Sequence, residues 1–330
     1  MSFLTSTGLA RPKYVIGVVG ITGQLGRAIA PIYLEDYKPF FSSVVGLVRN
    51  PTSDAAKGLA DAGVELRQVS ASDSADTIAN ALRGIDILVN VLNTDAAAFK
   101  DVVAEAAVKA GVSVYFLSEF GVDHSLNEFE GWDNYDWIHK RESESLARKL
   151  AGDKTKVISI YNSAFLEGAI GPWFGFDTGN KTYTAIGDPK ARLSFTSKSD
   201  IGRAIAELSL LSLGPSANTV PDRVRIAGDT VSIEGVATAL RKVRKELGID
   251  DIEIAIKSED LDAFRIKTKE RQLANPKSDP VWHIRILVGE NKLDFSADNS
   301  NELINPGGKV WKWKTLEDYF REIGGKPFGA

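Results

Sequence analysis

The stretch Gly20-Ile21-Thr22-Gly23-Gln24-Leu25-Gly26 decides the fold, because a strand pattern precedes it and a helix pattern follows it. The apolar run at residues 14–19 is typical of a short buried strand, and residues 27–30 are typical of a helix. Glycines let the chain turn tightly and approach a pyrophosphate, whose charge faces the free N–H groups of the first helical turn. Glycine recurs here at every third residue, so a plain structural turn is the alternative to a nucleotide site. The residues that we expect to contact the nucleotide are Gly20, Thr22, Gly23, Gln24 and Leu25.

One proline stands inside the expected helix. A proline there removes a hydrogen bond and tends to kink the axis, so we expect a kink at Pro31. Pro31 lies beyond the first turn, and the amides that face the phosphate are therefore unaffected.

The second predicted strand indicates which nucleotide binds. Its apolar run, residues 44–48, ends at Arg49, and the first acidic residue after it is Asp54. An NAD-specific chain usually carries Asp or Glu at the strand end, where the carboxylate binds the ribose 2′-hydroxyl and would repel a 2′-phosphate. Arg49 can instead hold a 2′-phosphate through a charge-assisted fork, and Lys57 can add a second cation. We therefore predict NADP(H) as the cofactor. The alternatives are an ordinary strand-end cation at Arg49 and a solvated helix lysine at Lys57.

Composition argues against several classes of protein. The 330 residues carry a formal net charge of -4, which gives no basic surface for nucleic acid. The chain has no cysteine and three histidines, none at metal-ligand spacing, so we expect neither disulfides nor a metal site. Residues 1–5 lack the features of a signal peptide, and no apolar run reaches the ~18–20 residues that cross a membrane. We therefore expect a cytoplasmic protein with no membrane and no nucleic-acid partner.

Short apolar runs alternate with helical patterns through the first half of the chain. Strand patterns occur at residues 14–19, 44–49, 64–67, 85–91, 112–117 and 157–161, and helix patterns at residues 74–83, 96–110 and 137–150. This alternation predicts an α/β protein with a Rossmann-type, doubly wound parallel sheet. Ligands in such sheets bind outside the carboxyl ends of the strands, so residues just after each strand, including Leu92 and Asn93, are candidates for cofactor binding.

The second half of the chain is less regular. We expect helices over residues 200–211 and 233–247, and strands over residues 182–186, 223–226 and 283–288. This change of rhythm predicts two parts. Residues 1–162 form an NADP-binding domain, and residues 163–330 form a smaller C-terminal substrate lobe with some elements that return to the first sheet.

Two segments at the expected crevice carry polar and aromatic side chains. Ser118-Glu119-Phe120-Gly121 directly follows the fifth strand, where its serine and phenylalanine could meet the nicotinamide end of a cofactor; a plain loop is the alternative. Trp132, Tyr135 and Trp137 lie further along the chain, and clustered aromatics beside a cleft favour a flat, apolar substrate. A helix that packs its aromatic face into the core is an equally good interpretation.

A tyrosine four residues before a lysine is the usual proton-transfer pair of short-chain dehydrogenases. Here Tyr135 and Lys140 are five residues apart, and residues i and i+5 of a helix do not share a face as i and i+4 do. The pair is therefore absent, and Lys140 would have to act without a tyrosine.

Several motifs of the chain occur together in one known family. They are residues 20–27, Leu47-Val48-Arg49, Leu117-Ser118-Glu119-Phe120-Gly121, and Lys140 about twenty residues later. Further matches are Asn162-Ser163-Ala164-Phe165, Gly187-Asp188, Asp200-Ile201-Gly202 and the tail at residues 305–319. With these motifs the chain resembles the isoflavone reductase-like branch of the NmrA-like proteins, which are atypical short-chain dehydrogenases, over about residues 13–320.

The resemblance implies NADPH held by the glycine loop, with Arg49 and Lys57 on the 2′-phosphate. It implies that Lys140 is the catalytic lysine, as a general base or an oxyanion stabiliser; orientation of the cofactor ribose is the competing role. The residues that the motifs place near the cofactor are Ser118, Phe120, Asn162 and Phe165.

Three departures from the family limit what carries over. Leu117 stands where the plant reductases have proline, and Ser163 stands where cysteine is common. The segment with Trp132 and Trp137 does not match their substrate-facing residues. The cofactor site therefore carries over better than the substrate does.

From this resemblance we expect an NADPH-dependent reductase of an aromatic, phenolic or conjugated small molecule, active as a monomer or homodimer. The alternative is a non-catalytic NADP(H)-binding regulator that reports redox state to a protein partner. Such regulators lack the catalytic lysine, so Lys140 favours the enzyme. A sugar-nucleotide epimerase of the extended dehydrogenase type fails on the missing tyrosine–lysine pair.

Overall fold

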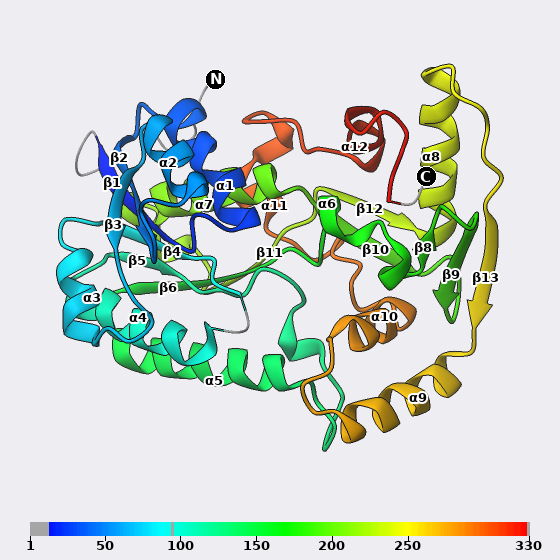
Figure 1. Ribbon diagram of the computed structural model, residues 1–330, viewed down its shortest axis with the longest axis horizontal. Coiled ribbons are helices and arrows are strands. Elements are labelled where there is room, and N and C mark those ends of the chain that lie inside the picture. Colours follow the sequence, from blue (N-terminus) through cyan, green and yellow to red (C-terminus); the bar gives the residue numbers. More distant parts are fainter. Residues whose placement is uncertain (1–12, 94–95, 329–330) are drawn as a thin grey trace.

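A seven-stranded parallel sheet organises the computed structural model, which describes residues 13–93 and 96–328 (Figure 1). Its strands are β1 (Tyr14–Val19), β2 (Phe41–Val48), β3 (Glu65–Gln68), β4 (Ile87–Asn90), β5 (Val114–Phe116), β6 (Lys156–Tyr161) and β11 (Arg223–Arg225). Their order is β11-β6-β5-β4-β1-β2-β3, and each neighbouring pair is parallel. The direction of winding reverses between β1 and β4, which confirms the doubly wound, Rossmann-type fold. Residues 1–5, where we expect no signal peptide, lie outside the described residues.

Helices cover both faces of this sheet. They are α1 (Gln24–Pro31), α2 (Asp54–Asp61), α3 (Ala75–Ala81), α4 (Ala97–Lys109), α5 (Tyr135–Ala151) and α7 (Lys198–Leu213). The helices α3, α4 and α5 pack side by side on one face, and α1 packs against α7 on the other (Figure 1). Since both faces are covered, β1, β2 and β4 are almost wholly buried, which explains their continuous apolar runs.

The kink expected at Pro31 takes the form of a widened turn. Pro31 ends α1, and the next residues form a π-helical turn, η1 (Ile32–Asp36). In it the N–H of Tyr37 donates to the carbonyl of Ile32 at 2.9 Å, so the chain continues after the proline with a different hydrogen-bond pattern. The buried Tyr37 hydroxyl then lies 2.8 Å from Glu207 Oε1 and joins this turn to α7.

The second half of the chain forms two smaller sheets. Their strands are β7 (Ala164–Phe165), β8 (Phe176–Asp177), β9 (Thr182–Ile186), β10 (Arg192–Thr196), β12 (Asp229–Ser232) and β13 (Ala255–Glu259), in the orders β12-β10-β7 and β13-β9-β8. The helices around them are α6 (Leu166–Ala169), α8 (Ile233–Glu246), α9 (Leu261–Ala274), α10 (Val281–Gly289), α11 (Asn301–Ile304) and α12 (Leu316–Glu322). β11 leaves this half and completes the large sheet beside β6. A domain boundary between residues 162 and 163 stays a prediction.

The strand predicted over residues 283–288 is wrong, because these residues lie in α10. The buried residues His283, Ile286 and Leu287 are three and four positions apart, which is the spacing of one helix face. A short apolar run carries no clear period of its own, so burial against α9 and β9 decides its structure.

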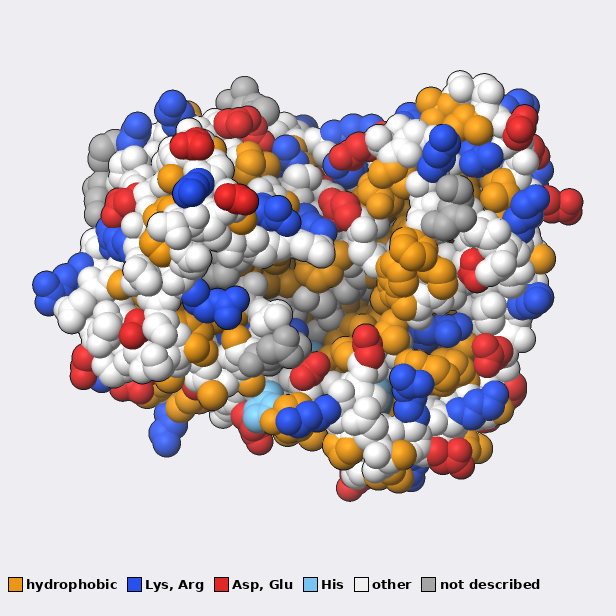
Figure 2. Space-filling model, viewed as in Figure 1, with side chains coloured by type: hydrophobic (Ala, Val, Ile, Leu, Met, Phe, Trp, Pro, Cys, Tyr) orange, Lys and Arg blue, Asp and Glu red, His pale blue; other side chains and the backbone are white. Residues whose placement is uncertain are grey.

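The face of the molecule in Figure 2 is hollowed in its middle. The hollow lies between the part that holds the seven-stranded sheet and the part that holds α8 and β13, and hydrophobic side chains gather around it (Figure 2). No helix within the described ranges has the length and apolar character that crossing a membrane requires.

A buried carboxylate fastens β11 to the large sheet. Glu144 on α5 accepts hydrogen bonds from Arg148 at 2.7 Å, from Arg223 on β11 at 2.9 Å and from Ser159 on β6 at 3.2 Å. Burial alone would raise the pKa of Glu144, but the hydrogen bonds from Arg223 and Arg148 outweigh it and hold the pKa below its ordinary value. The ionised form is therefore the one that stabilises the fold.

We expect Glu144→Ala to lower the free energy of unfolding by about 2–3 kcal/mol at pH 6, because it leaves two arginines without their shared acceptor. Glu142→Ala is the matched control on the same helix; its side chain is exposed, and the expected change is within about 0.5 kcal/mol. Because the pKa of Glu144 is lowered by folding, its contribution is full above the ordinary glutamate pKa and is lost as pH falls through the folded value. Urea denaturation at pH 6 and pH 3 should therefore show a gap between wild type and Glu144→Ala that narrows in acid. If Glu144→Ala lowers the free energy of unfolding at pH 6 no more than Glu142→Ala does, Glu144 does not stabilise the fold in this way.

Candidate functional site

The glycine loop lies at the carboxyl end of β1, and steric constraints explain its glycines. Gly20 has a φ of +86°, in the left-handed region that favours glycine. The N–H of Gly23 donates to the carbonyl of Gly20 at 2.9 Å and closes the turn. A Cβ at Gly26 would lie 2.4 Å from the Cα of Ile21, so α1 approaches β1 this closely only with glycine there. Gly23 caps α1 without a side chain, and the first N–H groups of a helix lack intrahelical partners.

The loops after β1, β4 and β5 meet at one edge of the sheet. A Cβ at Gly20 would lie 3.1 Å from the carbonyl carbon of Val91, so the two loops are in close contact. The hydroxyl of Ser118 donates to the carbonyl of Leu92 at 2.6 Å. Asn90 accepts from the N–H of Leu92 at 3.2 Å and fixes the start of that loop. The structure thus brings Gly20, Leu92 and Ser118 together, and the exposed Asn93 follows directly.

The predicted 2′-phosphate residues are both exposed. Arg49 directly follows β2, whose residue Leu47 pairs with Val19 of β1, so Arg49 lies beside the strand that leads into the glycine loop. Its guanidinium has no hydrogen bond or ion pair with the residues described at 13–93 and 96–328. Lys57 lies in the first turn of α2, which Ser53 caps by accepting from the N–H of Ala56 at 3.3 Å.

Lys140 is held at the same edge by the motif that follows β5. Its Nζ donates to the backbone carbonyl of Glu119 at 3.2 Å and lies 4.0 Å from Oε2 of that residue. The buried Glu119 carboxylate also lies 2.8 Å from Nε2 of the buried His124. Glu119 therefore positions Lys140. The sequence did not lead us to predict that Glu119 positions Lys140, although Glu119 is part of the Ser-Glu-Phe-Gly motif.

A small pocket joins Lys140 to the ends of β4 and β5. Ser118, Glu119 and Lys140 line it together with Asp136 and Ser143 of α5 and the buried Lys100 of α4. The contribution of Lys100 was missed as well, because it lies within an apolar helical pattern that predicts only core packing.

The segment after β6 holds an unsatisfied buried amide. The side chain of Asn162 is fully buried, and neither its nitrogen nor its oxygen has a hydrogen-bond partner among the described residues. Buried amides without a partner are uncommon and indicate a ligand or a water. Ser163 beside it has a φ of +57°, which costs energy for a residue with a Cβ, and its N–H donates to the carbonyl of Gly121 at 3.0 Å. Phe165 and the buried Phe120 both pack on the core that carries the glycine loop.

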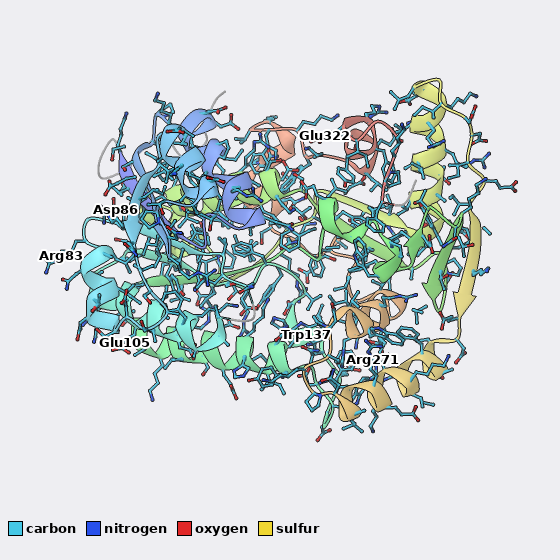
Figure 3. All side chains as sticks on the ribbon, in the orientation of Figure 1. Arg83, Asp86, Glu105, Trp137, Arg271 and Glu322 are labelled. Carbon is cyan, nitrogen blue, oxygen red and sulfur yellow. The ribbon has the colours of Figure 1, made fainter. Side chains whose placement is uncertain are left out.

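The aromatic segment packs into the core rather than lining a cleft. Trp132 and Trp137 are buried, and both rings contact Phe129 and His283. Figure 3 shows Trp137 at the end of α5 that lies beside α10. Tyr135 is exposed, with its ring 4.3 Å from that of His139. The core-packing interpretation of this segment is therefore the one that the structure supports.

Lys198 adds a cation beside the glycine loop. Its Nζ donates to Oε1 of Gln24 at 3.0 Å, and its backbone N–H donates to Glu167 at 3.1 Å. This contact joins the start of α7 to the start of α1. Nothing in the local sequence around Lys198 signals it, because the two residues are 174 positions apart.

We expect Gly26→Ala to lower the free energy of unfolding by about 2 kcal/mol, because the new methyl meets the backbone of Ile21, which cannot move aside. Gly58→Ala on α2 is the matched control, since a Cβ there has no atom within 4 Å. It should be neutral or stabilise the protein by up to about 1 kcal/mol, as alanine favours helix. Urea denaturation of both variants tests this. Equal effects would show that the close approach of α1 to β1 is not the constraint.

Comparison with known proteins identifies the family of the chain. The model of the NmrA-like family matches residues 12–319. The oxidoreductase aprR of Aspergillus flavus is 26% identical over 237 residues, which are 72% of this chain and 76% of that protein. An NmrA-like family domain-containing protein of Dictyostelium discoideum is 24% identical and covers 74% of this chain and 83% of its own length.

Solved structures share the fold at low sequence identity. The complex of leucoanthocyanidin reductase with NADPH from Vitis vinifera has a TM-score of 0.74 at 17% identity, covering 94% of this chain and 100% of that one. An isoflavone reductase has a TM-score of 0.69 at 16% identity, covering 94% and 99%. NmrA, a negative transcriptional regulator, has a TM-score of 0.66 at 19% identity, covering 94% and 95%. The family match spans almost the whole sequence, and the chain therefore belongs to the NmrA-like family.

Proposed function

We propose that the chain is an NADPH-dependent reductase that transfers hydride to an aromatic, phenolic or otherwise conjugated small molecule. The observation that carries the proposal is that a half-buried lysine lies at the same sheet edge as the glycine loop. Contacts link the two step by step: Gly20 meets the loop after β4, Leu92 of that loop accepts from Ser118, and Ser118 lines a pocket with Lys140. A cofactor in the glycine loop and a proton-exchanging group would thus share one crevice.

The residues present fit NADPH. Gly23 precedes α1 and has no side chain to cap it, so a pyrophosphate can accept from the first N–H groups of the helix. Arg49 is an unpaired cation among the described residues, and the buried amide of Asn162 lacks a hydrogen-bond partner, which a nicotinamide carboxamide can supply. When bound, NADPH supplies the hydride. The other residues that we propose around it are Thr22, Gln24, Leu25, Lys57, Leu92, Asn93, Ser118, Phe120, Lys140 and Phe165. Leucoanthocyanidin reductase, whose fold is similar, binds NADPH.

Lys140 is the residue that we propose for acid–base chemistry. Its Nζ is anchored to Glu119, so it can remove a phenolic proton or stabilise negative charge that develops on a substrate oxygen. The hydrophobic side chains around the hollow of Figure 2 suit an aromatic substrate.

The second candidate is a non-catalytic regulator that binds NADP(H) and a protein partner. The similarity to the fold of NmrA supports it, because NmrA is a negative transcriptional regulator. Lys140 favours the enzyme, since family regulators lack this lysine. A panel of quinones, enones, lignan-type phenolics and isoflavones separates the two candidates: oxidation of NADPH with any of them supports the reductase. No turnover, with a clear preference between NADP and NADPH, supports the regulator.

We expect Lys140→Ala to lower kcat at least about 100-fold at saturating NADPH, because general acid–base groups contribute on the order of 10²–10⁴. The dissociation constant for NADPH should stay within about threefold, since the glycine loop and Arg49 are untouched. Lys149→Ala, an exposed lysine on the same helix, is the control and should match wild type. Steady-state kinetics with cofactor titrations decide the point. Weaker NADPH binding with intact turnover at saturation would assign Lys140 to the cofactor ribose instead.

We expect the wild type to bind NADPH at least about tenfold more tightly than NADH, because a charge-assisted contact to the 2′-phosphate contributes ~1.5–3 kcal/mol. Arg49→Asp should reverse this order, since it removes the cation and adds a repelling charge. Arg83→Asp is the control: Arg83 is exposed before β4, at the outer edge of the molecule (Figure 3), and its change should keep the preference for NADPH. Calorimetry of both cofactors on the three proteins measures it. Equal affinities in the wild type would refute the role of Arg49.

A further inference from the structure

Lys100 is a buried lysine in an otherwise apolar helix face. Lys100 is 8% exposed, and the other buried residues of α4 are phenylalanine, valine and alanine. Ala97 and Ala104 lie on the same side of the helix as Lys100 and line the same pocket, so small side chains leave space around the amine. Burying a cation is costly unless it is paired, and core packing alone does not account for a lysine at this position.

The amine of Lys100 has no hydrogen bond or ion pair with residues 13–93 or 96–328. The neighbouring residue Asp101, in contrast, has a partner, because its carboxylate accepts a hydrogen bond from Ser143 at 2.5 Å. Lys109, at the end of the same helix, is paired with Asp76 at 2.9 Å and with Glu105 at 2.8 Å. Lys100 instead lines the small pocket that Lys140 of α5 also lines.

Charged groups of α4, of α5 and of the segment after β5 lie near Lys100. Burial, and after it the positive charge of Lys140, lower the pKa of Lys100 to about 8, against the opposing effects of Glu119, Asp136 and Asp101. His139 and Tyr115 also line the pocket. An ordinary lysine has a pKa of ~10.4, so Lys100 loses its proton far more readily near neutral pH than an exposed lysine does.

We propose that Lys100 and Lys140 form a coupled lysine pair, in which Lys100 replaces the proton that Lys140 gives to the substrate. This inference rests on the proposed function of Lys140. In the step, one N–H bond of the Lys100 ammonium breaks and one N–H bond forms on the neutral amine that Lys140 becomes when it gives its proton to the substrate oxygen, directly or through one water in the pocket. No electrons change hands, and Lys100 then regains a proton from solvent.

The exchange keeps the total charge of the pocket constant. A second full positive charge beside Lys140 would be opposed by like-charge repulsion, whereas a proton that moves between the two amines leaves one charge for the carboxylate of Glu119. Lys100 acts on the substrate only through Lys140 and is therefore a positioning residue.

Competitive acetylation with acetic anhydride tests the coupling without any substrate. Peptide mass spectrometry between pH 6 and pH 11 gives the titration of each lysine in the intact protein. We expect Lys100 to titrate near pH 8 and Lys109, the internal control on the same helix, at or above its ordinary value, because hydrogen bonds to Glu105 and Asp76 raise its pKa. In Lys140→Met, loss of the like charge should move the titration of Lys100 to higher pH. A Lys100 that titrates like Lys109, or that does not respond to Lys140→Met, would overturn the pair.

The pH dependence of kcat/KM tests the proton transfer itself. The wild type should show an ionisation near pH 8 that Lys100→Met abolishes, with kcat/KM at pH 7 lowered about tenfold and NADPH affinity within about twofold. Lys100→Arg keeps the positive charge but cannot release a proton at these pH values, so it should be as slow as Lys100→Met. A charge-only role would be rescued by arginine and would refute the exchange.

The two arms separate this inference from the proposed function. Turnover with an unchanged pH profile in Lys100→Met would refute the pair and support the reductase. A chain that turns over no substrate while Lys100 still responds to Lys140→Met would refute the reductase and support the coupling of the two lysines.

Discussion

The close approach of α1 to β1 is the constraint on which the site depends. At Gly26 the helix lies against the backbone of Ile21, with no room for a Cβ. The same helix meets α7 at Gly202, where a Cβ would lie 3.1 Å from Ile29 and Ile32. These contacts fix the direction in which the first N–H groups of α1 point, and with it the position of any phosphate that they bind.

A second constraint is the burial of charge beside that loop. Glu119 holds Lys140 through its backbone carbonyl and meets His124 through its carboxylate, and Lys100 approaches the same pocket from α4. Inside a protein, charges interact more strongly than in water, and each one needs compensation. A cluster of buried charges destabilises the fold. Clusters of this kind are found mainly at functional sites, where they shift the pKa values of the groups involved. The arrangement is consistent with a chain that retains these charges for chemistry.

Part of this structure could be predicted from the sequence, because local patterns determine it. The glycine loop, the strand ends at Arg49 and Ser118 and the doubly wound order follow from short motifs and from the alternation of strands with helices. The helix at residues 283–288 could not be predicted, since six apolar or mixed residues fit either period and tertiary packing decides between them.

Other parts of the site depend on contacts between distant residues. The sequence allowed Trp132 and Trp137 either to line a cleft or to pack into the core. The packing of α10 decides between the two, because both rings contact its residue His283. The pocket of Lys100 depends on how α4 packs on α5, and the contact of Lys198 with Gln24 depends on how α7 packs on α1. No local pattern contains that information. The sequence likewise does not show that the buried side-chain amide of Asn162 has no hydrogen-bond partner among the described residues, because this depends on the residues packed around it.

A crystal structure of the NADPH complex tests most directly whether one crevice holds the cofactor between Arg49 and Lys140. We expect the 2′-phosphate at hydrogen-bond distance from the guanidinium of Arg49, the pyrophosphate against the first turn of α1, and the nicotinamide carboxamide on the amide of Asn162. The nicotinamide ring would then lie on the side of the crevice that carries Lys140. A cofactor bound away from the glycine loop, or a nicotinamide ring remote from Lys140 and Asn162, would contradict the account.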